Sequence, residues 1–206
     1  MNEKEKMLSG KIYDPNNKEL VDARAKAHKL CYEYNNTMEE EVDKRRDILK
    51  RLTPSSSDDL FLQGPIYFDY GTNITFGKCS YANFNLTILD TCKVTIGDSV
   101  LIGPNVSIYT AMHPLNKDDR SIYFDEEKGY YTDKEYGKEV VIGEGSWICG
   151  NVVICPGVHI GKGVVIGAGS VVTRDIPDNS LAFGNPCKVQ REIKEEDKLK
   201  YHKELF

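Results

Sequence analysis

An apolar residue recurs at every sixth position through much of the second half of the chain. One uninterrupted block places branched aliphatic residues at Ile142, Ile148, Ile154, Ile160, Ile166 and Val172. An earlier block is less regular and contains a slip of two residues, at Phe76, Ala82 and Ile88 and then at Ile96, Ile102 and Ile108. A six-residue period is what a parallel β-helix of triangular cross-section requires, because each hexad supplies one short strand and one turn. The period therefore predicts such a β-helix.

Three hexads complete one coil of this fold. An inward Ile then stacks on the residue eighteen positions later, at the strand spacing of about 4.8 Å. Twelve hexads predict about four coils, with room for a partial coil at residues 66–70. The alternative is a β-sandwich, whose strands would alternate with period two and be joined by loops of unequal length. Cys149 and Cys155, one hexad apart, are expected on adjacent faces and unbridged.

The N-terminal part of the chain has a helical pattern instead. Residues 20–34 place their apolar side chains on one face at a spacing of 3.6. Thr37 followed by Glu40 is a capping-box signature for a second helix over residues 38–52. The Ser- and Asp-rich stretch 53–59 is typical of a linker. We expect a helical segment at 1–62, a β-helix at 63–190 with an excursion loop at 109–139, and a C-terminal tail with a short helix at 191–206.

Charge and composition exclude several classes of function. A net charge of −5, with 40% hydrophobic residues, argues against a general nucleic-acid or anionic-membrane binder. The charged N-terminus lacks the apolar run of a signal peptide, and no stretch is apolar enough to span a bilayer. The four His and six Cys show no zinc-type clustering. We expect a cytoplasmic protein with reduced cysteines and no metal.

His113 stands where the repeat stops. The hexad beginning at Ile108 is followed by a gap, and the repeat resumes only near Ile142. Long loops in compact domains are usually functional, and Pro114 favours an extended conformation for His113. An imidazole, with an intrinsic pKa of about 6.5, is suited to take a proton from a hydroxyl near neutral pH. The alternative is a solvated loop histidine.

Further motifs accompany the repeat. They are Gly10-Lys-Ile-Tyr-Asp14, Tyr81-Ala-Asn-Phe-Asn85, Ile102-Gly-Pro-Asn-Val106, His113-Pro-Leu115, Gly145-Ser-Trp-Ile148 and Gly184-Asn-Pro-Cys187. In that order they resemble the maltose/galactoside O-acetyltransferases, which are hexapeptide-repeat acyltransferases. The resemblance covers nearly the whole chain. It implies a mainly β fold: a left-handed parallel β-helix with an N-terminal α-helical segment and a short C-terminal helix.

The resemblance also implies a reaction and its residues. Acetyl-CoA would give its acetyl group to a hydroxyl of a maltose-, glucose- or galactoside-like sugar, with His113 as general base and Asn83 helping to stabilise the oxyanion. The implied acceptor residues are Asp14, Arg24, Asp69, Tyr81, Asn83 and Asp90. The implied acetyl-CoA residues are Gly150, Ala168, Thr173, Arg174, Lys188 and Arg191. The family forms homotrimers with each site between subunits, so that His113 and Asn83 would come from different chains.

Several of these residues have structural alternatives. Asp14 would equally start a turn, Asp90 would equally cap a turn at the two-residue slip, and Arg24 would equally pair with a carboxylate. Some relatives carry the pocket acid one residue later, where this chain has Thr91. The segment 121–133 is longer than in most relatives, and either covers the acceptor site or is a tolerated surface insertion.

Other functions remain open from the sequence. Within acetyltransferases, the acceptor would alternatively be an amine, an antibiotic or another xenobiotic. A trimeric scaffold that has lost activity is a second alternative. A metal enzyme of the β-helix carbonic anhydrase type would need three His on facing edges, whereas only His113 and His159 lie in the predicted β-helix.

Overall fold

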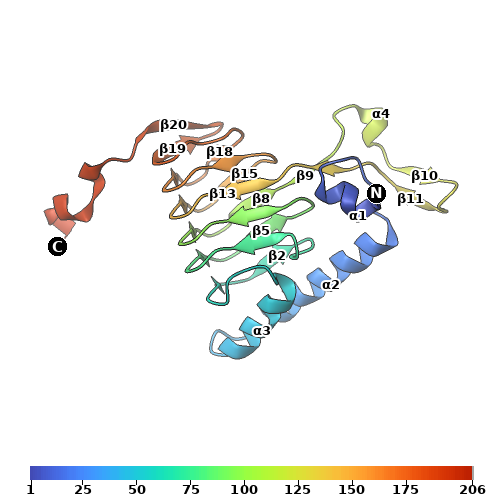
Figure 1. The fold of residues 1–206 in the computed structure, drawn as a ribbon, viewed down its shortest axis with the longest axis horizontal. Helices are drawn as coiled ribbons and strands as arrows, with labels where there is room; N and C mark the ends of the chain where they lie inside the picture. The colour runs from blue at the N-terminus through green and yellow to red at the C-terminus, as the bar shows by residue number, and fades with distance from the viewer. Residues whose placement is uncertain (206) are drawn as a thin grey trace.

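The computed structural model describes residues 1–205, and a parallel β-helix dominates it (Figure 1). The first sheet contains β1 (Phe61–Leu62), β4 (Tyr81–Ala82), β7 (Leu101–Ile102), β14 (Trp147–Ile148), β17 (Val165–Ile166), β19 (Ser180–Gly184) and the antiparallel β20 (Cys187–Glu192). The second contains β2 (Ile66–Phe68), β5 (Leu86–Leu89), β8 (Ser107–Tyr109), β15 (Val153–Ile154) and β18 (Val171–Val172). The third contains β3 (Ile74–Phe76), β6 (Val94–Ile96), β13 (Val140–Ile142) and β16 (His159–Ile160). The predicted β-helix is confirmed.

Strand register follows the apolar period. Ile148 pairs with Ile102 on one side and with Ile166 on the other, and all three side chains are buried. The predicted interval of eighteen residues therefore holds in the second block. In the first block the interval is twenty residues, as in the pair Ala82 and Ile102, because each coil there takes up the two-residue slip. The prediction of about four coils is wrong, since the stacked strands β1 to β19 of the first sheet mark six turns.

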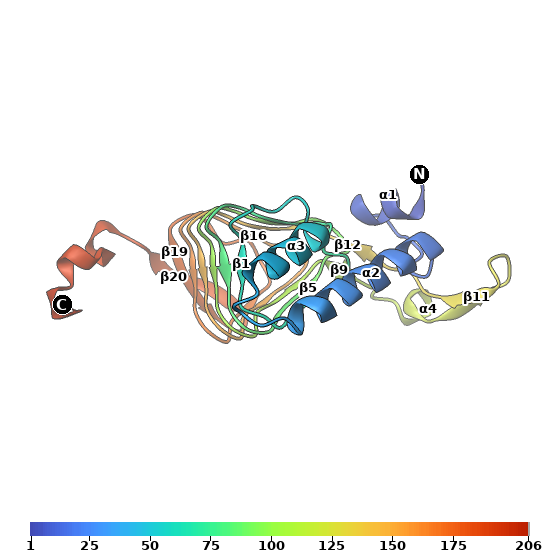
Figure 2. The same cartoon turned by 90° about the horizontal axis from the view of Figure 1, so that it is seen from below.

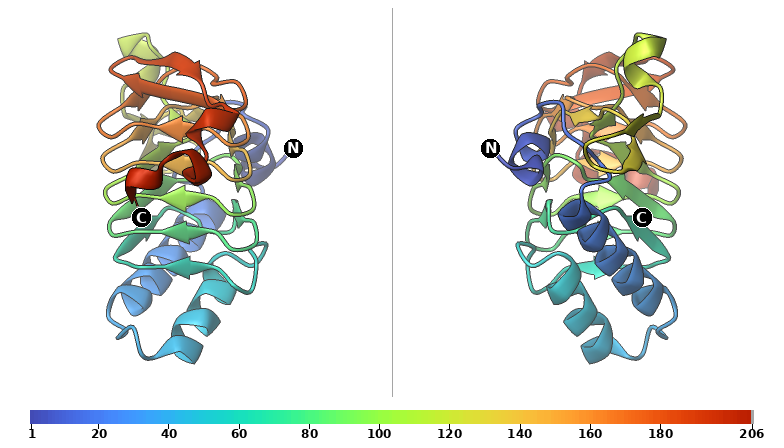
Figure 3. Two further views of the ribbon diagram at one scale, coloured as in Figure 1. Left: turned by 90° about the vertical axis from the view of Figure 1, so that its left-hand side faces the viewer. Right: turned by 90° about the vertical axis from the view of Figure 1, so that its right-hand side faces the viewer.

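Helices cover one end of the coils. They are α2 (Lys18–Asn35) and α3 (Val42–Leu52), whereas α1 (Glu3–Leu8) lies at the flank of the prism against β12 (Tyr136–Gly137), as Figure 1 shows. Figures 2 and 3 show α2 and α3 at the end of the prism where the first coil begins, with β19 and β20 at the other end. Leu30, Ile48 and Leu52 are buried and join the same core as the coil interior. The first coil would otherwise expose its apolar interior to water, so the helices act as the terminal cap that a solenoid needs.

The start of α3 differs from the capping-box prediction. The helix begins at Val42, with Glu41 at the N-cap position and no side-chain capping bond. Thr37 instead donates its hydroxyl to the carbonyl of Tyr34, at the end of α2. The Met38 N–H is bonded by the side chain of Glu41, so residues 38–41 form a turn. Thr37 therefore closes the preceding helix and does not open the next.

The excursion between β8 and β13 is structured. β9 (Ala111–Met112) pairs antiparallel with β12 (Tyr136–Gly137) and closes its base. The short helix α4 (Lys117–Arg120) follows, and then β10 (Tyr123–Asp125) and β11 (Tyr130–Thr132) form an antiparallel hairpin. Figures 1 and 2 show this hairpin beside the start of α2, on the opposite side of the prism from the C-terminal tail.

The tail and the cysteines complete the description. The expected C-terminal helix takes the form of three short 3-10 helices, η1 (Glu195–Asp197), η2 (Leu199–Tyr201) and η3 (Lys203–Leu205). All six cysteines are free, and Cys149 and Cys155 follow strands of neighbouring sheets as predicted. Within residues 1–205 there is no helix long and apolar enough to cross a membrane.

Candidate active site

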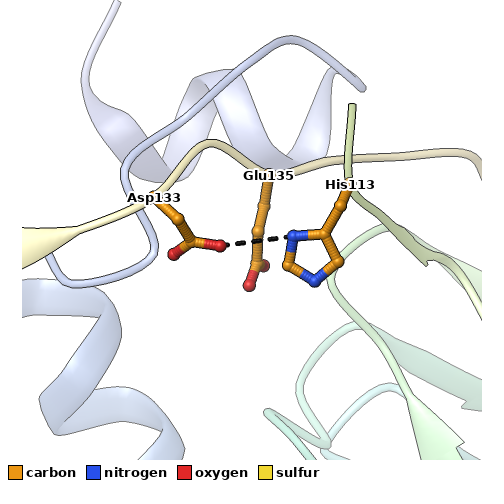
Figure 4. Close-up of side chains that lie close together, drawn as sticks. All are labelled: His113, Asp133 and Glu135. Atoms are coloured by element: carbon orange, nitrogen blue, oxygen red, sulfur yellow. Dashed lines mark ion pairs between the residues drawn. The ribbon is translucent and has the colours of Figure 1, made fainter. Parts of the chain in front are cut away.

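His113 follows β9 directly, at the base of the excursion. Its Nδ1 lies 3.2 Å from Oδ2 of Asp133, and 47% of the imidazole side chain is exposed. Figure 4 shows the other ring nitrogen pointing away from this contact. A carboxylate at Nδ1 holds the proton on that nitrogen and leaves the Nε2 lone pair free to act as acceptor. The arrangement suits a general base that works through Nε2.

Glu135 lies between Asp133 and His113 in the view of Figure 4. One ligand atom each of His113, Asp133 and Glu135 fall within 4.8 Å of one another, and mixed imidazole and carboxylate sets are known metal ligands. Here Glu135 Oε2 accepts a hydrogen bond of 2.5 Å from the Tyr13 hydroxyl, and Asp133 pairs with the imidazole. Burial raises the pKa of Glu135. Because Glu135 already accepts a hydrogen bond from Tyr13 and Asp133 pairs with the imidazole, we interpret the cluster as a network of ion-pair and hydrogen-bond contacts beside His113.

A cavity of about 300 Å³ opens beside this network. It is lined by Pro15, Asn16, Arg24, His28, Asp69, Tyr70, Thr91, Asp133 and Glu135. A second cavity of about 320 Å³ shares His28 and Asp69 with the first and is otherwise lined mainly by apolar side chains from α2, β2 and β5. The structure thus joins a polar chamber to an apolar groove, and volumes of this order are typical of small-molecule sites.

Two of the predicted acceptor residues lie in the polar chamber. The Arg24 guanidinium donates to the Tyr70 hydroxyl at 2.9 Å and to a backbone carbonyl. Asp69 Oδ1 lies 3.7 Å from Nε2 of His28. Burial raises the pKa of Asp69, and the nearby His28 and Arg24 offset part of that rise. A cation and a carboxylate facing one chamber offer both donors and acceptors to a polyhydroxylated ligand.

Asp90 does not line the chamber. Its side chain is 0% exposed, and its oxygens accept hydrogen bonds from the backbone N–H groups of Tyr70 and Asn73 at 2.9 and 3.4 Å. The carboxylate therefore caps the corner 70–73 of the preceding coil. The direct acceptor contact predicted for Asp90 does not fit this structure, because both oxygens are used inside the fold. Thr91, the next residue, faces the chamber instead.

The position of Asp90 makes a testable contribution to stability. Burial raises the pKa of Asp90 to about 7, whereas an unfolded Asp titrates at about 3.9. Between these values the folded protein holds a proton that the unfolded chain has lost, so this contribution to stability declines as pH rises from about 4 to about 7. We expect Asp90→Asn to remove that decline, as measured by urea unfolding of both proteins across this range. If the two curves of free energy of unfolding against pH ran parallel, the assignment would be wrong.

Asp14 does not line the polar chamber either. Its carboxylate accepts hydrogen bonds from Lys128 Nζ at 2.9 Å, from the Tyr130 hydroxyl at 2.7 Å and from the Thr132 hydroxyl. Only 7% of the Asp14 side chain is exposed. Burial raises the pKa of Asp14, but the hydrogen bonds from Thr132, Tyr130 and Lys128 outweigh it and hold the pKa below its usual value. Asp14 thus contacts the β10–β11 hairpin, whereas the predicted contact was with the acceptor.

Tyr81 and Asn83 lie along a different edge of the prism. They belong to β4 and to the corner that joins the first sheet to the second, whereas His113 emerges where the second sheet leads into the third. Within one chain, the two catalytic candidates His113 and Asn83 are therefore separated by the width of the second sheet.

The predicted acetyl-CoA residues are spread over three places. Gly150 and Ala168 follow β14 and β17, on the same edge as Asn83. Thr173 and Arg174 are exposed after β18, on the edge of His113. Lys188 and Arg191 lie on β20, where Arg191 makes two bonds of 2.7 Å to Asp197 and lowers the pKa of that carboxyl to about 2. One chain does not gather these six residues into one surface.

Asp133 and Glu135 were missed in the sequence. They belong to the same excursion as His113, residues 109–139, and its acidic residues were the one signal available. Their positions near the imidazole depend on the pairing of β9 with β12 and on the Tyr13 bridge to Glu135. Neither pairing has a local sequence signature.

Comparison with known proteins gives consistent matches. Residues 6–54 match the maltose acetyltransferase hexapeptide capping motif, and residues 139–174 match the bacterial transferase hexapeptide (six repeats). Galactoside O-acetyltransferase of Escherichia coli K12 is 41% identical over 200 residues, which cover 97% of this chain and 94% of that protein. The crystal structure of a maltose O-acetyltransferase from Clostridium difficile 630 has a TM-score of 0.84 at 48% identity, covering 95% of this chain and 99% of that one. A galactoside acetyltransferase in complex with coenzyme A has a TM-score of 0.82 at 40% identity, covering 96% and 94%.

Proposed function

The chain belongs to the maltose and galactoside O-acetyltransferases, which are acetyl-CoA-dependent enzymes built on hexapeptide repeats, and we propose that its acceptor is a sugar hydroxyl and its general base is His113. The observation that carries the proposal is the free Nε2 of His113 beside a polar chamber. Arg24 and Asp69, which line that chamber, offer a donor and an acceptor to neighbouring hydroxyls.

The proposed reaction is a direct transfer. Nε2 of His113 removes the hydroxyl proton as the sugar oxygen attacks the thioester carbonyl of acetyl-CoA. The tetrahedral intermediate then expels the CoA thiolate, which takes the proton back from the imidazolium. The products are the O-acetyl sugar and free CoA. Asp133 at Nδ1 stabilises the imidazolium while it exists.

The oxyanion requires hydrogen-bond donors, and the predicted donor Asn83 does not lie on the edge of His113 within one chain. Asn83 lies on the neighbouring edge, so we propose that a second subunit presents its Asn83 to the first subunit's His113 in a homotrimer. Large apolar side chains on the outer face of the first sheet support such an interface, because Phe61, Leu101 and Trp147 are 42%, 49% and 50% exposed. Closed assemblies of identical chains commonly bury surfaces of this kind.

Acetyl-CoA is proposed to lie along the edge that carries Asn83. Gly150 and Ala168 are small residues on this edge, which lets an extended ligand approach the backbone closely. Lys188 is exposed on β20 and offers a charge to a phosphate. Arg191 would have to release the Asp197 carboxylate before it could bind a phosphate. The free cysteines are those expected of a protein in the reducing cytoplasm, where we place it.

A panel of acceptors tests the proposal. We expect thiol release from acetyl-CoA to accelerate with maltose, glucose and galactosides, and to accelerate less with amines and nucleosides of similar size. Preference for an amine or an antibiotic would support the alternative acceptor class. Absence of turnover on every hydroxyl and amine tested, with CoA still bound, would support a silent scaffold.

A further inference from the structure

We propose that the β10–β11 hairpin is a positioning device for His113, held in place by Asp14, and that Asp14 acts on catalysis through Asp133. The inference rests on the proposed role of His113 as general base. It assigns a role to the long excursion and replaces the acceptor contact predicted for Asp14.

The N-terminal residues 13–16 bind the C-terminal half of the excursion, at residues 128–135. The Asp14 carboxylate accepts hydrogen bonds from Lys128, Tyr130 and Thr132, all on the hairpin. The Asn16 side-chain amide donates to the carbonyl of Tyr131 at 3.0 Å. The backbone of Tyr13 pairs antiparallel with that of Glu135. Two segments more than a hundred residues apart are thus joined by side-chain and backbone bonds.

Asp133 lies between two of these fixed points. Thr132, directly before it, is 0% exposed and donates to Asp14. Glu135, two residues after it, is bound by both the hydroxyl and the backbone of Tyr13. The neighbouring residues Tyr13 and Asp14 therefore determine where the Asp133 carboxylate stands, and it stands 3.2 Å from His113 Nδ1.

This placement has a chemical consequence for His113. An unconstrained histidine favours the proton on Nε2, which leaves that nitrogen unable to accept one. A carboxylate at Nδ1 selects the opposite tautomer and fixes the ring orientation. His113 itself is about half exposed, so few packing contacts hold the ring, and Asp133 must supply the constraint.

Lys128 strengthens the anchor. Its ammonium lies 2.9 Å from Asp14 and 3.1 Å from Asp125, and these carboxylates raise the pKa of Lys128. Removing the Asp14 carboxylate would leave Lys128, Tyr130 and Thr132 without their common acceptor. The hairpin, whose two strands otherwise pair only with each other, would then lose its principal bond to the rest of the protein.

Nitrogen NMR of the histidine ring tests the inference without any substrate. Full-length protein labelled with heavy nitrogen in its histidines is examined at alkaline pH, with His113 assigned by comparison with His113→Ala. We expect the Nδ1-protonated tautomer in the wild type and a tautomer mixture in Asp14→Ala. Asp22→Ala is the matched control, because Asp22 lies nearby on α2 and pairs only with Lys18 at the surface. An unchanged His113 tautomer in Asp14→Ala would overturn the proposal.

Kinetics separate this role from acceptor binding. Asp14→Ala and Asp133→Asn should each lower kcat roughly 10- to 100-fold, the cost of a misplaced catalytic group, with KM for acetyl-CoA unchanged. Because Asp14 acts through Asp133, the double variant should be no slower than Asp133→Asn alone. A raised acceptor KM in Asp14→Ala, with effects that multiply in the double variant, would instead show direct acceptor binding by Asp14.

Two further measurements keep the outcomes distinct. CoA binding and thermal unfolding identify any variant that fails to fold. If Asp14→Ala fails to fold, Asp14→Asn replaces it, because asparagine keeps the shape of the side chain and removes its charge. If His113→Ala leaves turnover intact, the proposed function fails while the tautomer result still decides the hairpin's role. If His113→Ala abolishes turnover but the tautomer is unchanged in Asp14→Ala, the hairpin proposal alone fails.

Discussion

Replacing His113 with alanine is expected to lower turnover with acetyl-CoA and a sugar at least ~100-fold, the usual loss when a general base is removed. The acceptor hydroxyl then has to lose its proton to water during the attack. The affinity for CoA should change little, since four of the six predicted CoA residues lie on β20 or on the edge of Gly150, away from the imidazole, and only Thr173 and Arg174 share its edge. Steady-state thiol release and equilibrium CoA binding measure the two effects separately.

His159 provides the matched control for this variant. It lies on β16 in the same β-helix, is 52% exposed, and approaches only Glu139, at 3.9 Å. We expect His159→Ala to keep turnover near that of the wild type. Near-normal turnover in His113→Ala, or equal losses in both variants, would contradict the assignment of the base.

Replacing Ile148 with alanine is expected to cost about 2–5 kcal/mol of unfolding free energy. Its side chain is 0% exposed and stacks between Ile102 and Ile166 along the axis. The coils above and below are each hydrogen-bonded to the coil that carries Ile148, so they are not free to collapse into the cavity left behind. For a chain of this size, the midpoint of thermal unfolding should fall by roughly 5–20 °C.

Ile122 is the control for the core prediction. It carries the same side chain but is 74% exposed in the excursion, so Ile122→Ala should change stability little. Unfolding followed by circular dichroism measures both variants. Similar losses at the two positions would contradict an inward Ile148.

The sixfold period predicted the fold well where it was unbroken. From Ile142 to Val172 the strands stack at the predicted interval, since every coil has three hexads of equal length. The first coil was predicted only as a partial coil at residues 66–70. Its inward residues Leu62, Phe68 and Phe76 are spaced by six and then by eight positions, so the sixfold period alone does not connect them. Because the corners between strands differ in length, successive inward residues are not always six positions apart. The length of each corner depends on the hydrogen bonds of the whole coil.

The candidate site was predictable only in part. His113 was predicted from the break in the repeat together with the family resemblance. The resemblance alone implied Arg24 and Asp69, which line the chamber beside it. Asp90 is polar and close in sequence to the site, yet its side chain turns inward to cap a corner. Local sequence also misled at Thr37, whose hydroxyl closes α2 and does not begin α3.

The partners of His113 depend on contacts between distant segments. Asp133 reaches the imidazole because Asp14 and Tyr13 hold the excursion from more than a hundred residues away. No periodic pattern or short motif encodes that pairing. The proposed positioning role therefore gives the excursion a structural explanation, where the sequence alone left open an acceptor lid or a surface insertion.

The central claim is that the protein transfers an acetyl group from acetyl-CoA directly to a sugar hydroxyl. The decisive measurement is carbon NMR of a reaction containing acetyl-CoA labelled with heavy carbon in its carbonyl group, the wild-type protein and a galactoside or maltose. The account predicts a labelled acetyl ester on a sugar oxygen, formed in the wild type and not in His113→Ala. Labelled free acetate with no sugar ester, or ester formation that is equal in the two proteins, would contradict it.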